Sequence, residues 1–281
     1  MTNKNIYPVY TQIKEEPSTI CKELKEDVFE YSFFNEGVSN SYTENSENYD
    51  LDNLDLAQKD DDLILRAIIF HTSHCGSTLV SRMLSQLSEV RVLSEPESVN
   101  GLLLSAILHE IEPKEVMRKL MRIIKAYCRK NTPQKYLIVK LTSWNVFNIE
   151  LFQKCFPKTK WLFLDRNTDE LLSSLEKNKG GFIDWWAHPV DVIRKHFIRP
   201  NVAVLNRHDY LKEMVTGHRE KARMASNANA LFLKYPSFID KFSEILDHFE
   251  IVASKDDMQR ATQVLDYDSK APKEHYRHND R

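Results

Sequence analysis

The sequence predicts an α/β fold, an open and mainly parallel β-sheet flanked by helices. Two observations carry this prediction: short apolar, β-branched runs alternate with helical patterns from residue 63 onward, and a small-residue turn follows the first of these runs. Strands that alternate with helices indicate βαβ units, whose strands lie parallel in one sheet. The 281 residues are 42% hydrophobic and 28% charged, which provides enough apolar material for a large core.

The first strand is expected at 63–70, where the run LILRAIIF lies between an acidic triplet and a small-residue loop. A helix is expected at 79–87, because Leu79, Met83 and Leu87 lie on one face. The same patterns place strands at 90–93, 136–141, 161–165 and 230–233, and helices at 102–130, 144–156 and 168–177. Beyond Gly180 the pattern is mostly helical.

Charge divides the chain into two regions. Residues 1–62 hold 15 acidic and 5 basic side chains, and residues 40–62 offer little to bury. We expect an acidic N-terminal arm over 1–62, partly flexible, followed by one α/β domain over 63–281. That domain holds 34 basic and 26 acidic side chains, an excess that suits an anionic ligand.

The four cysteines form no CxxC pair, as expected of reduced thiols in the cytoplasm: Cys21, Cys75, Cys128 and Cys155. No apolar run approaches the roughly 18–20 residues that a membrane helix needs. The first 14 residues lack the pattern of a signal peptide. We expect a cytoplasmic protein with no nucleic-acid or membrane partner; the oligomeric state is left open.

The turn that follows the first strand is the most informative segment. Residues 71–78, HTSHCGST, join a strand to a helix, an arrangement in which backbone N–H groups and a helix N-terminus face an anion. The phosphate loop GxxxxGK[ST] is not matched, because His71 replaces its first glycine and Ser77 its lysine. An N-cap turn without a ligand remains the alternative.

Residues 73–79, SHCGSTL, resemble the loop [PR]-[KR]-S-G-[ST]-T-[WL] of the sulfotransferase family. A second family element is a strand that ends in arginine, with a serine eight positions later. Here Arg166 ends the run WLFLDR, and Ser174 follows at that spacing. The resemblance covers about residues 64–250, and it implies a P-loop-like sulfotransferase fold that binds 3′-phosphoadenosine-5′-phosphosulfate (PAPS).

The resemblance assigns a phosphate to each motif. It places the 5′-phosphosulfate on the loop residues Ser73, Cys75, Gly76, Ser77 and Thr78. It places the 3′-phosphate on Arg166 and Ser174. Arginine at the carboxyl end of a parallel strand lies where open α/β sheets bind ligands, and its planar fork suits a phosphate. A surface ion pair for Arg166 and an ordinary helix hydroxyl for Ser174 are the alternatives.

Two further residues are candidates beside the phosphosulfate. Glu95 lies 19 positions after Gly76, where the resemblance implies a base that takes the proton of an acceptor hydroxyl. A helix-capping role is the alternative. Lys140 resembles the lysine of the family's "K-x-P" strand end, although Thr142 replaces the proline, and a strand-end lysine with no ligand is equally consistent.

The chain departs from the family at three further places. His74 stands where the family has a lysine or arginine that stabilises the departing oxygen, a role that requires a protonated ring. Cys75 replaces a serine. The family's C-terminal closing motif is missing, and Lys270, in a segment similar to the "SKAP" tail of some bacterial relatives, is a candidate to cover the cofactor. His71 and His74 lack a third ligand, so no metal is expected.

Together these features predict a transferase that moves a sulfuryl group from PAPS to a hydroxyl of a small-molecule or carbohydrate acceptor, with adenosine 3′,5′-bisphosphate as product. Two alternatives stay open. An ATP-dependent small-molecule kinase is kept open by Asp165 at the sheet edge. A catalytically inactive nucleotide-binding adaptor is kept open by His74 and the acidic arm.

Overall fold

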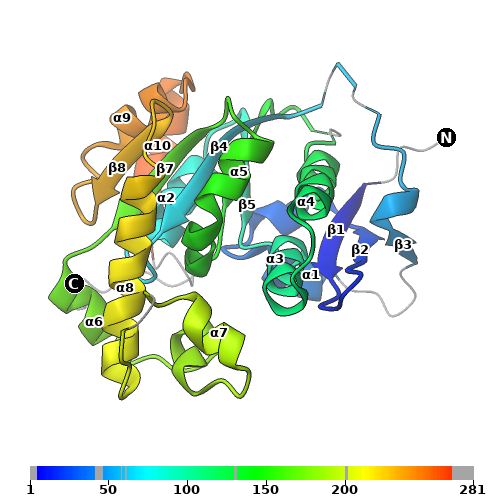
Figure 1. Cartoon of the computed structure of the whole chain (residues 1–281). Helices are drawn as coiled ribbons and strands as arrows, with labels where there is room; N and C mark the ends of the chain where they lie inside the picture. The colour runs from blue at the N-terminus through cyan, green and yellow to red at the C-terminus, as the bar shows by residue number, and fades with distance from the viewer. Residues whose placement is uncertain are drawn as a thin grey trace.

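A computed structural model describes residues 5–41, 47–57, 59–60, 62–129, 132–199 and 202–267. At its centre is a five-stranded sheet, in the order β5-β6-β4-β7-β8, in which every neighbouring pair is parallel (Figure 1). The strands are β4 (Ile64–His71), β5 (Val90–Ser94), β6 (Tyr136–Lys140), β7 (Lys160–Asp165) and β8 (Ala230–Lys234). The predicted open parallel sheet is confirmed.

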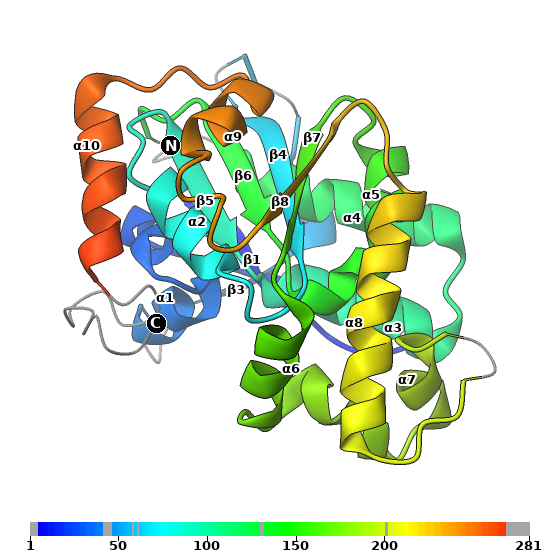
Figure 2. The ribbon, with the colours of Figure 1, turned by 90° about the vertical axis from the view of Figure 1, so that its left-hand side faces the viewer.

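Helices cover both faces of this sheet, because the strands are apolar on both sides. Ala67 and Ile69 of β4 pack toward α2 (Ser77–Leu84), α9 (Phe242–His248) and α10 (Lys255–Gln263), which lie together in Figure 2. Ile68 and Phe70 point to the opposite face, as alternation along a strand requires. That face is covered by α3 (Glu97–His109), α4 (Pro113–Tyr127) and α5 (Ile149–Cys155).

The topology determines where a ligand can bind. From β4 the chain proceeds to β5 and β6 on one side of the sheet, and β7 and β8 lie on the other side. Open α/β sheets bind ligands outside the carboxyl ends of the strands at such a reversal. His71 at the end of β4 and Leu164 in β7 are register partners, so the segments that follow these two strands begin side by side.

The N-terminal residues fold against this domain. They form an antiparallel sheet of β1 (Ile6–Thr11), β2 (Thr19–Glu23) and β3 (Asn48–Asp50), with α1 (Phe34–Asn40) and the short 3₁₀ helices η1 (Glu26–Glu30) and η2 (Leu51–Asn53). β1 packs so closely on α3 that a Cβ on Gly101 would lie 2.2 Å from the carbonyl oxygen of Thr11.

Apolar side chains hold this N-terminal part in place. Tyr7, Val28 and Leu51 belong to the same buried cluster as β4 and α4. Arg91 of β5 is also buried, and it donates to the carboxylate of Glu26 at 2.6 Å. Apolar residues of 5–41 and 47–57 therefore pack against the α/β domain. The division into an N-terminal arm and a domain beginning at 63 stays a prediction.

Two predicted helices are each divided in the structure. The helix expected at 102–130 is interrupted where Glu110 adopts a φ of 51° and Pro113 begins α4. Proline fits the first turn of a helix but not its interior, which explains the break. The helix expected at 144–156 begins as the 3₁₀ helix η3 (Ser143–Asn148) and continues as α5.

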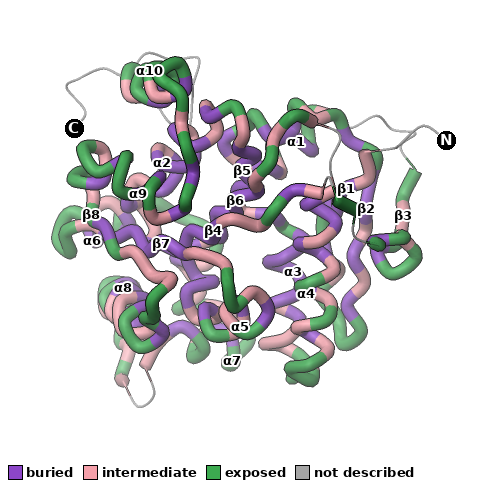
Figure 3. Tube along the Cα trace, turned by 90° about the horizontal axis from the view of Figure 1, so that it is seen from above, coloured by how far each residue is buried: buried purple, intermediate pink, exposed green. Residues whose placement is uncertain are grey.

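The remaining elements lie beyond β7. They are α6 (Thr168–Glu176), the 3₁₀ helix η4 (Gly181–Ala187), α7 (Asp191–His196), α8 (Arg207–Met224) and the 3₁₀ helix η5 (Val264–Asp266). In Figure 3, β5 and β6 are almost wholly buried, whereas the edge strand β8 is largely intermediate or exposed. In the described ranges, no helix combines the length and the apolar character needed to span a membrane.

Candidate functional site

The loop between β4 and α2 turns sharply at two residues with left-handed backbone. His74 has a φ of 56°, and Gly76, which precedes the first residue of α2, has a φ of 83°. The first N–H groups of a helix have no partner within the helix, so those at the start of α2 face the space beyond the loop. Ser77 and Thr78 begin α2 and are largely buried, whereas Ser73 is half-buried.

Both residues of the second motif meet this loop. The Nη1 atom of Arg166 lies 3.4 Å from the carbonyl oxygen of His74. The Oγ atom of Ser174 lies 2.8 Å from the Nδ1 atom of the His74 ring. Arg166 follows β7, and Ser174 lies two turns into α6. The structure thus brings together, at one sheet edge, residues about 90 to 100 positions apart in the sequence.

Arg166 is held lightly enough to take a ligand. Its Nε atom donates to Glu170 at 2.9 Å, one turn along α6, and both side chains reach solvent, with exposed fractions of 28% and 57%. An exposed ion pair of this kind contributes only about 0.3–0.5 kcal/mol. A phosphate can therefore displace Glu170 at little cost.

Tyr235 is a site residue that the sequence pattern did not single out. It follows β8, and the guanidinium carbon of Arg166 lies 4.9 Å from the centre of its ring. A Cβ on Gly76 would lie 2.8 Å from its Cδ2 atom. Tyr235 thus packs between the two phosphate motifs. Its place directly after the last short strand is the signal that would have indicated it.

Asp165, the residue on which the kinase alternative depends, already has hydrogen-bond partners at both of its carboxylate oxygens. Arg219 of α8 donates to both of its carboxylate oxygens, each at 2.9 Å, and Thr72 donates to one of them at 3.2 Å. Arg219 also donates to the carbonyl oxygen of Arg166 at 2.7 Å. Asp165 and Arg219 therefore fix the end of β7. No spacing in the sequence linked these two residues.

Glu95 and Lys140 form an ion pair beside the loop. Glu95 directly follows β5, and Lys140 is the last residue of the neighbouring strand β6. The N–H group of Glu95 donates to the carbonyl oxygen of Lys140 at 2.7 Å. The Lys140 side chain is fully buried, while that of Glu95 is 24% exposed. Lys140 Nζ also lies 3.5 Å from Thr78 Oγ1 in the first turn of α2. Both candidates thus lie next to the phosphate loop, and of the two side chains only that of Glu95 reaches solvent.

The N-terminal segment covers this ion pair. The ring of Phe33 lies over Lys140 Nζ, 4.8 Å from its centre, and Asn35 donates to Glu97 at 3.3 Å. Docking of the apolar stretch 27–34 on the domain was open from the sequence, but its contact with Lys140 was not predicted.

Two other loop residues, Cys75 and His71, are buried, and burial keeps both side chains uncharged. Burial raises the pKa of Cys75 to about 12, so its thiol is neutral and is not a nucleophile. Burial, followed by the charge of Lys140, lowers the pKa of His71 to about 4. The ring nitrogens of His71 contact two backbone carbonyls, those of Thr72 and Leu141. Its role is to support the loop. Lys270 lies outside the described residues.

Gly76 provides a first prediction. We expect Gly76→Ala to destabilise the protein by about 1–3 kcal/mol, because alanine disfavours this φ and its methyl group collides with Tyr235. Chemical unfolding measures the loss. Gly181→Ala is the matched control: Gly181 has a φ of 62°, but nothing lies within 4 Å of the added carbon. Equal losses in the two variants would show that the contact with Tyr235 contributes nothing.

Acid sensitivity provides a second prediction, because two histidines are buried and neutral. Burial, followed by the charges of His71 and Arg219, lowers the pKa of His218 to about 3. Neither of its ring nitrogens has a hydrogen-bond partner within the described part of the chain. A depressed histidine pKa contributes stability that is complete above pH 6.5 and is lost as the pH falls toward the folded value.

Between pH 7 and pH 5 the free energy of unfolding should therefore fall by about 2 kcal/mol for each of these two histidines. His218→Leu removes a ring without partners, so it should leave stability at pH 7 nearly unchanged and remove about half of the acid loss. Urea unfolding at both pH values measures this. His109→Leu, at an exposed position, should keep the full loss. A similar loss in His218→Leu and in the parent protein would contradict the assignment.

Comparisons with known proteins give structural likeness alone. No protein-family model matches the chain, and no curated protein does. The chain is similar to a sulfotransferase from Mycobacterium avium at 12% identity and a TM-score of 0.48, covering 74% of this chain and 68% of that one.

Two other solved structures are also similar at 12% identity. One is a sulfotransferase from Alicyclobacillus acidocaldarius, with a TM-score of 0.42 and coverage of 67% of this chain and 82% of that one. The other is retinol dehydratase in a complex with retinol and PAP, with a TM-score of 0.32 and coverage of 71% and 64%. What the chain does is argued from its own site.

Proposed function

We propose that the protein transfers a sulfuryl group from PAPS to a hydroxyl of a small-molecule or carbohydrate acceptor. The observation that carries the proposal is the meeting of the two phosphate motifs. Arg166 and Ser174 both contact His74, in the loop that leads into α2. One arginine, one hydroxyl and the N-terminus of a helix form a cradle for two phosphate groups on one nucleotide.

The residues divide between the two ends of that nucleotide. The N–H groups at the start of α2, with Ser77 and Thr78, would bind the 5′-phosphosulfate. Arg166 and Ser174 would bind the 3′-phosphate by displacing the contacts to Glu170 and His74 that they now make. Tyr235 supports both groups, since it packs on Gly76 and on Arg166.

Glu95 would act as the base. Its ion pair with Lys140 presents it as a carboxylate, the form that accepts a proton, and its partial exposure lets an acceptor approach. The acceptor oxygen attacks sulfur, the bond from sulfur to the bridging oxygen breaks, and the hydroxyl proton passes to Glu95. The bisphosphate leaves with the bridging electrons. Positioning and charge stabilisation supply most of the rate, as in phosphoryl transfer.

His74 would face the oxygen from which sulfur departs. A protonated ring can stabilise that charge, and neighbouring phosphates favour the protonated form. Without a nucleotide the Nδ1 atom of this ring contacts Ser174 Oγ at 2.8 Å, and a 3′-phosphate bound by Ser174 would release the ring toward the departing oxygen.

Incubation of the purified protein with sulfur-labelled PAPS and a panel of alcohols, phenols and sugars tests the proposal. The expected result is label in an acceptor, and inhibition by added adenosine 3′,5′-bisphosphate. Phosphate transfer from ATP with magnesium would favour a kinase, although Arg219 occupies both oxygens of Asp165. Tight bisphosphate binding without transfer to any acceptor would favour the non-catalytic adaptor.

A further inference from the structure

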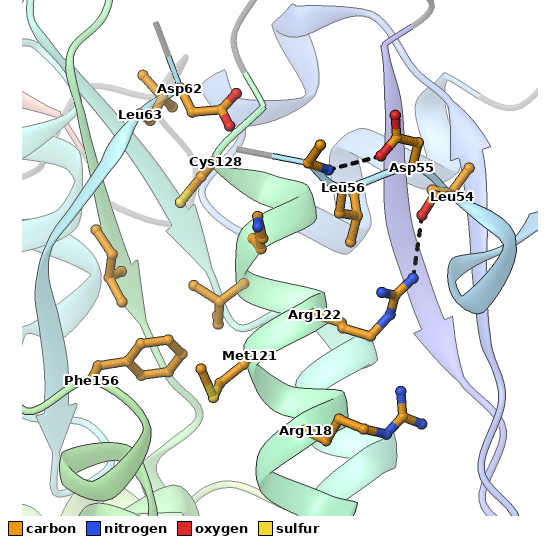
Figure 4. A pocket seen from close by; sticks show the side chains of 14 residues that line it. Leu54, Asp55, Leu56, Asp62, Leu63, Arg118, Met121, Arg122, Cys128 and Phe156 are labelled. Atoms are coloured by element: carbon orange, nitrogen blue, oxygen red, sulfur yellow. Dashed lines mark hydrogen bonds between the residues drawn. The ribbon is translucent and has the colours of Figure 1, made fainter. Parts of the chain in front are cut away.

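The N-terminal residues contact the α/β domain at two places that differ in their packing. Beside α4 a cavity of about 920 Å³ remains, and Leu56 and Met121 lie in its wall (Figure 4). At the carboxyl edge of the sheet, by contrast, the segment of residues 26–35 reaches the ion pair of Glu95 and Lys140, and the Lys140 side chain is fully buried there. The second contact is therefore the one that can affect the proposed reaction.

Two arginines of the α/β domain hold this segment. Arg91 of β5 donates to the carboxylate of Glu26 at 2.6 Å, and its own side chain is fully buried. Arg82 of α2 donates to the backbone carbonyl oxygen of Glu30, also at 2.6 Å. Hydrogen bonds from a charged donor are stronger than neutral ones. The segment is thus fixed to β5, which ends beside Glu95, and to α2, which begins at the phosphate loop.

Two consecutive phenylalanines of the segment contact different surroundings. Phe33 has an extended backbone, with φ −130° and ψ 133°, and α1 begins at Phe34. The Phe34 side chain is buried, and its ring centre lies 5.4 Å from those of Phe29 and Tyr127. Neighbouring side chains of an extended chain point to opposite sides. Phe34 therefore anchors the segment in the core, while the ring of Phe33 lies over Lys140.

The Lys140 ammonium has three N–H donors and no access to solvent. Glu95 accepts one of them, and Thr78 Oγ1 lies 3.5 Å from Nζ. The ring centre of Phe33 lies 4.8 Å from Nζ, within the roughly 6 Å of a cation–π contact. Phe33 is itself only half-buried. Because the ring lies over Nζ and also reaches solvent, it shields this side of the ammonium from water.

From this arrangement we infer that Phe33 is a positioning residue for the base. By keeping water away from Lys140, it keeps the ammonium bound to Glu95 and so holds the carboxylate in place for the acceptor. Water at Nζ would compete for the same N–H groups and would weaken the attraction between the two charges. The inference rests on the proposed function, because it is the transfer reaction that gives Glu95 its role.

Acetylation of the full-length protein with a low dose of acetic anhydride, followed by mass spectrometry, measures the shielding without any transfer reaction. In the parent protein, Lys140 should stay unmodified while the exposed Lys114 reacts. Phe33→Ala should raise the rate at Lys140 about tenfold, the factor that corresponds to the loss of a desolvated cation–π contact. Lys22, which is buried in β2, is the matched control and should stay unmodified in both proteins.

Transfer assays measure the effect on the base. Phe33→Ala should lower kcat about tenfold at saturating PAPS and leave the affinity for adenosine 3′,5′-bisphosphate unchanged, because a displaced base loses rate but not nucleotide contacts. Phe33→Tyr keeps the ring and should restore kcat. Tyr31→Ala removes an exposed side chain two positions away and should behave as the parent protein does.

A second variant keeps the test decisive if Phe33→Ala releases the N-terminal sheet, which modification of Lys22 would reveal. Phe33→Gln keeps most of the side-chain volume but places an amide oxygen beside Nζ, where it competes with Glu95, so kcat should again fall about tenfold. The inference is overturned if Lys140 reacts equally in Phe33→Ala and in the parent, or if both variants transfer at the parent rate.

Failure of the proposed function would be recognised separately. A parent protein that transfers sulfuryl to no acceptor would refute that function, and with it the role of Phe33 at the base, even if acetylation showed that the ring shields Lys140. A parent protein that transfers sulfuryl, with variants of Phe33 that do so equally well, would refute only the role of Phe33.

Discussion

Arg166→Ala is expected to weaken the binding of adenosine 3′,5′-bisphosphate by about 100-fold, while AMP binding changes little. The reason is that Arg166 is assigned to the 3′-phosphate, which AMP lacks. Its guanidinium already lies at the loop, 3.4 Å from the carbonyl oxygen of His74, and only an exposed partner has to be displaced. Calorimetric titration with both nucleotides measures the difference.

Three variants separate this effect from a general loss of positive charge. Arg118→Ala removes an exposed arginine from α4 and should bind both nucleotides normally. Arg166→Lys keeps the charge but not the planar fork, so an intermediate affinity is expected. Ser174→Ala should weaken bisphosphate binding less than Arg166→Ala does. If Arg166→Ala weakens AMP and the bisphosphate equally, the arginine does not read the 3′-phosphate.

Glu95→Gln is expected to lower the rate of sulfuryl transfer by about 10²–10⁴-fold and to leave bisphosphate affinity nearly unchanged. The amide keeps the shape of the side chain but cannot take the proton. Because it also leaves the fully buried Lys140 without its carboxylate, we expect a loss of about 2 kcal/mol in the free energy of unfolding. Initial rates at saturating PAPS, together with urea unfolding, measure the two effects.

Glu97→Gln is the matched control, because Glu97 lies two residues away, is exposed and contacts Asn35 rather than Lys140. It should retain activity and stability. The double variant Glu95→Gln with Lys140→Met should recover much of the stability but none of the activity, since it removes both members of the buried pair. Transfer at the parent rate in Glu95→Gln would show that another group is the base.

The sequence was sufficient for the central sheet because each strand carries its own signal. A run such as LILRAIIF is apolar at every position except Arg66, as expected of a strand covered on both faces, and it was expected within one residue of its observed end. The order of the motifs along alternating strands and helices then placed Gly76 and Arg166 at the same sheet edge. The phosphates assigned to these residues came from the family resemblance.

The remainder depends on contacts between distant residues, which no local pattern encodes. Arg219 reaches Asp165 across 54 positions, and Tyr235 completes the site from the loop after the last strand. The N-terminal sheet was missed because the excess of acidic residues over 1–62 outweighed the apolar residues of the sheet, such as Tyr7 and Val9. Their burial against α3 and α4 becomes evident only when the partner surface is known.

A crystal structure of the protein with adenosine 3′,5′-bisphosphate tests the central proposal most directly. The account predicts one nucleotide, with its 5′-phosphate at the N–H groups that begin α2 and its 3′-phosphate within hydrogen-bonding distance of Arg166 and Ser174. Glu170 should then have released Arg166. A nucleotide bound elsewhere, or one whose 3′-phosphate faces solvent while Arg166 stays on Glu170, would contradict it.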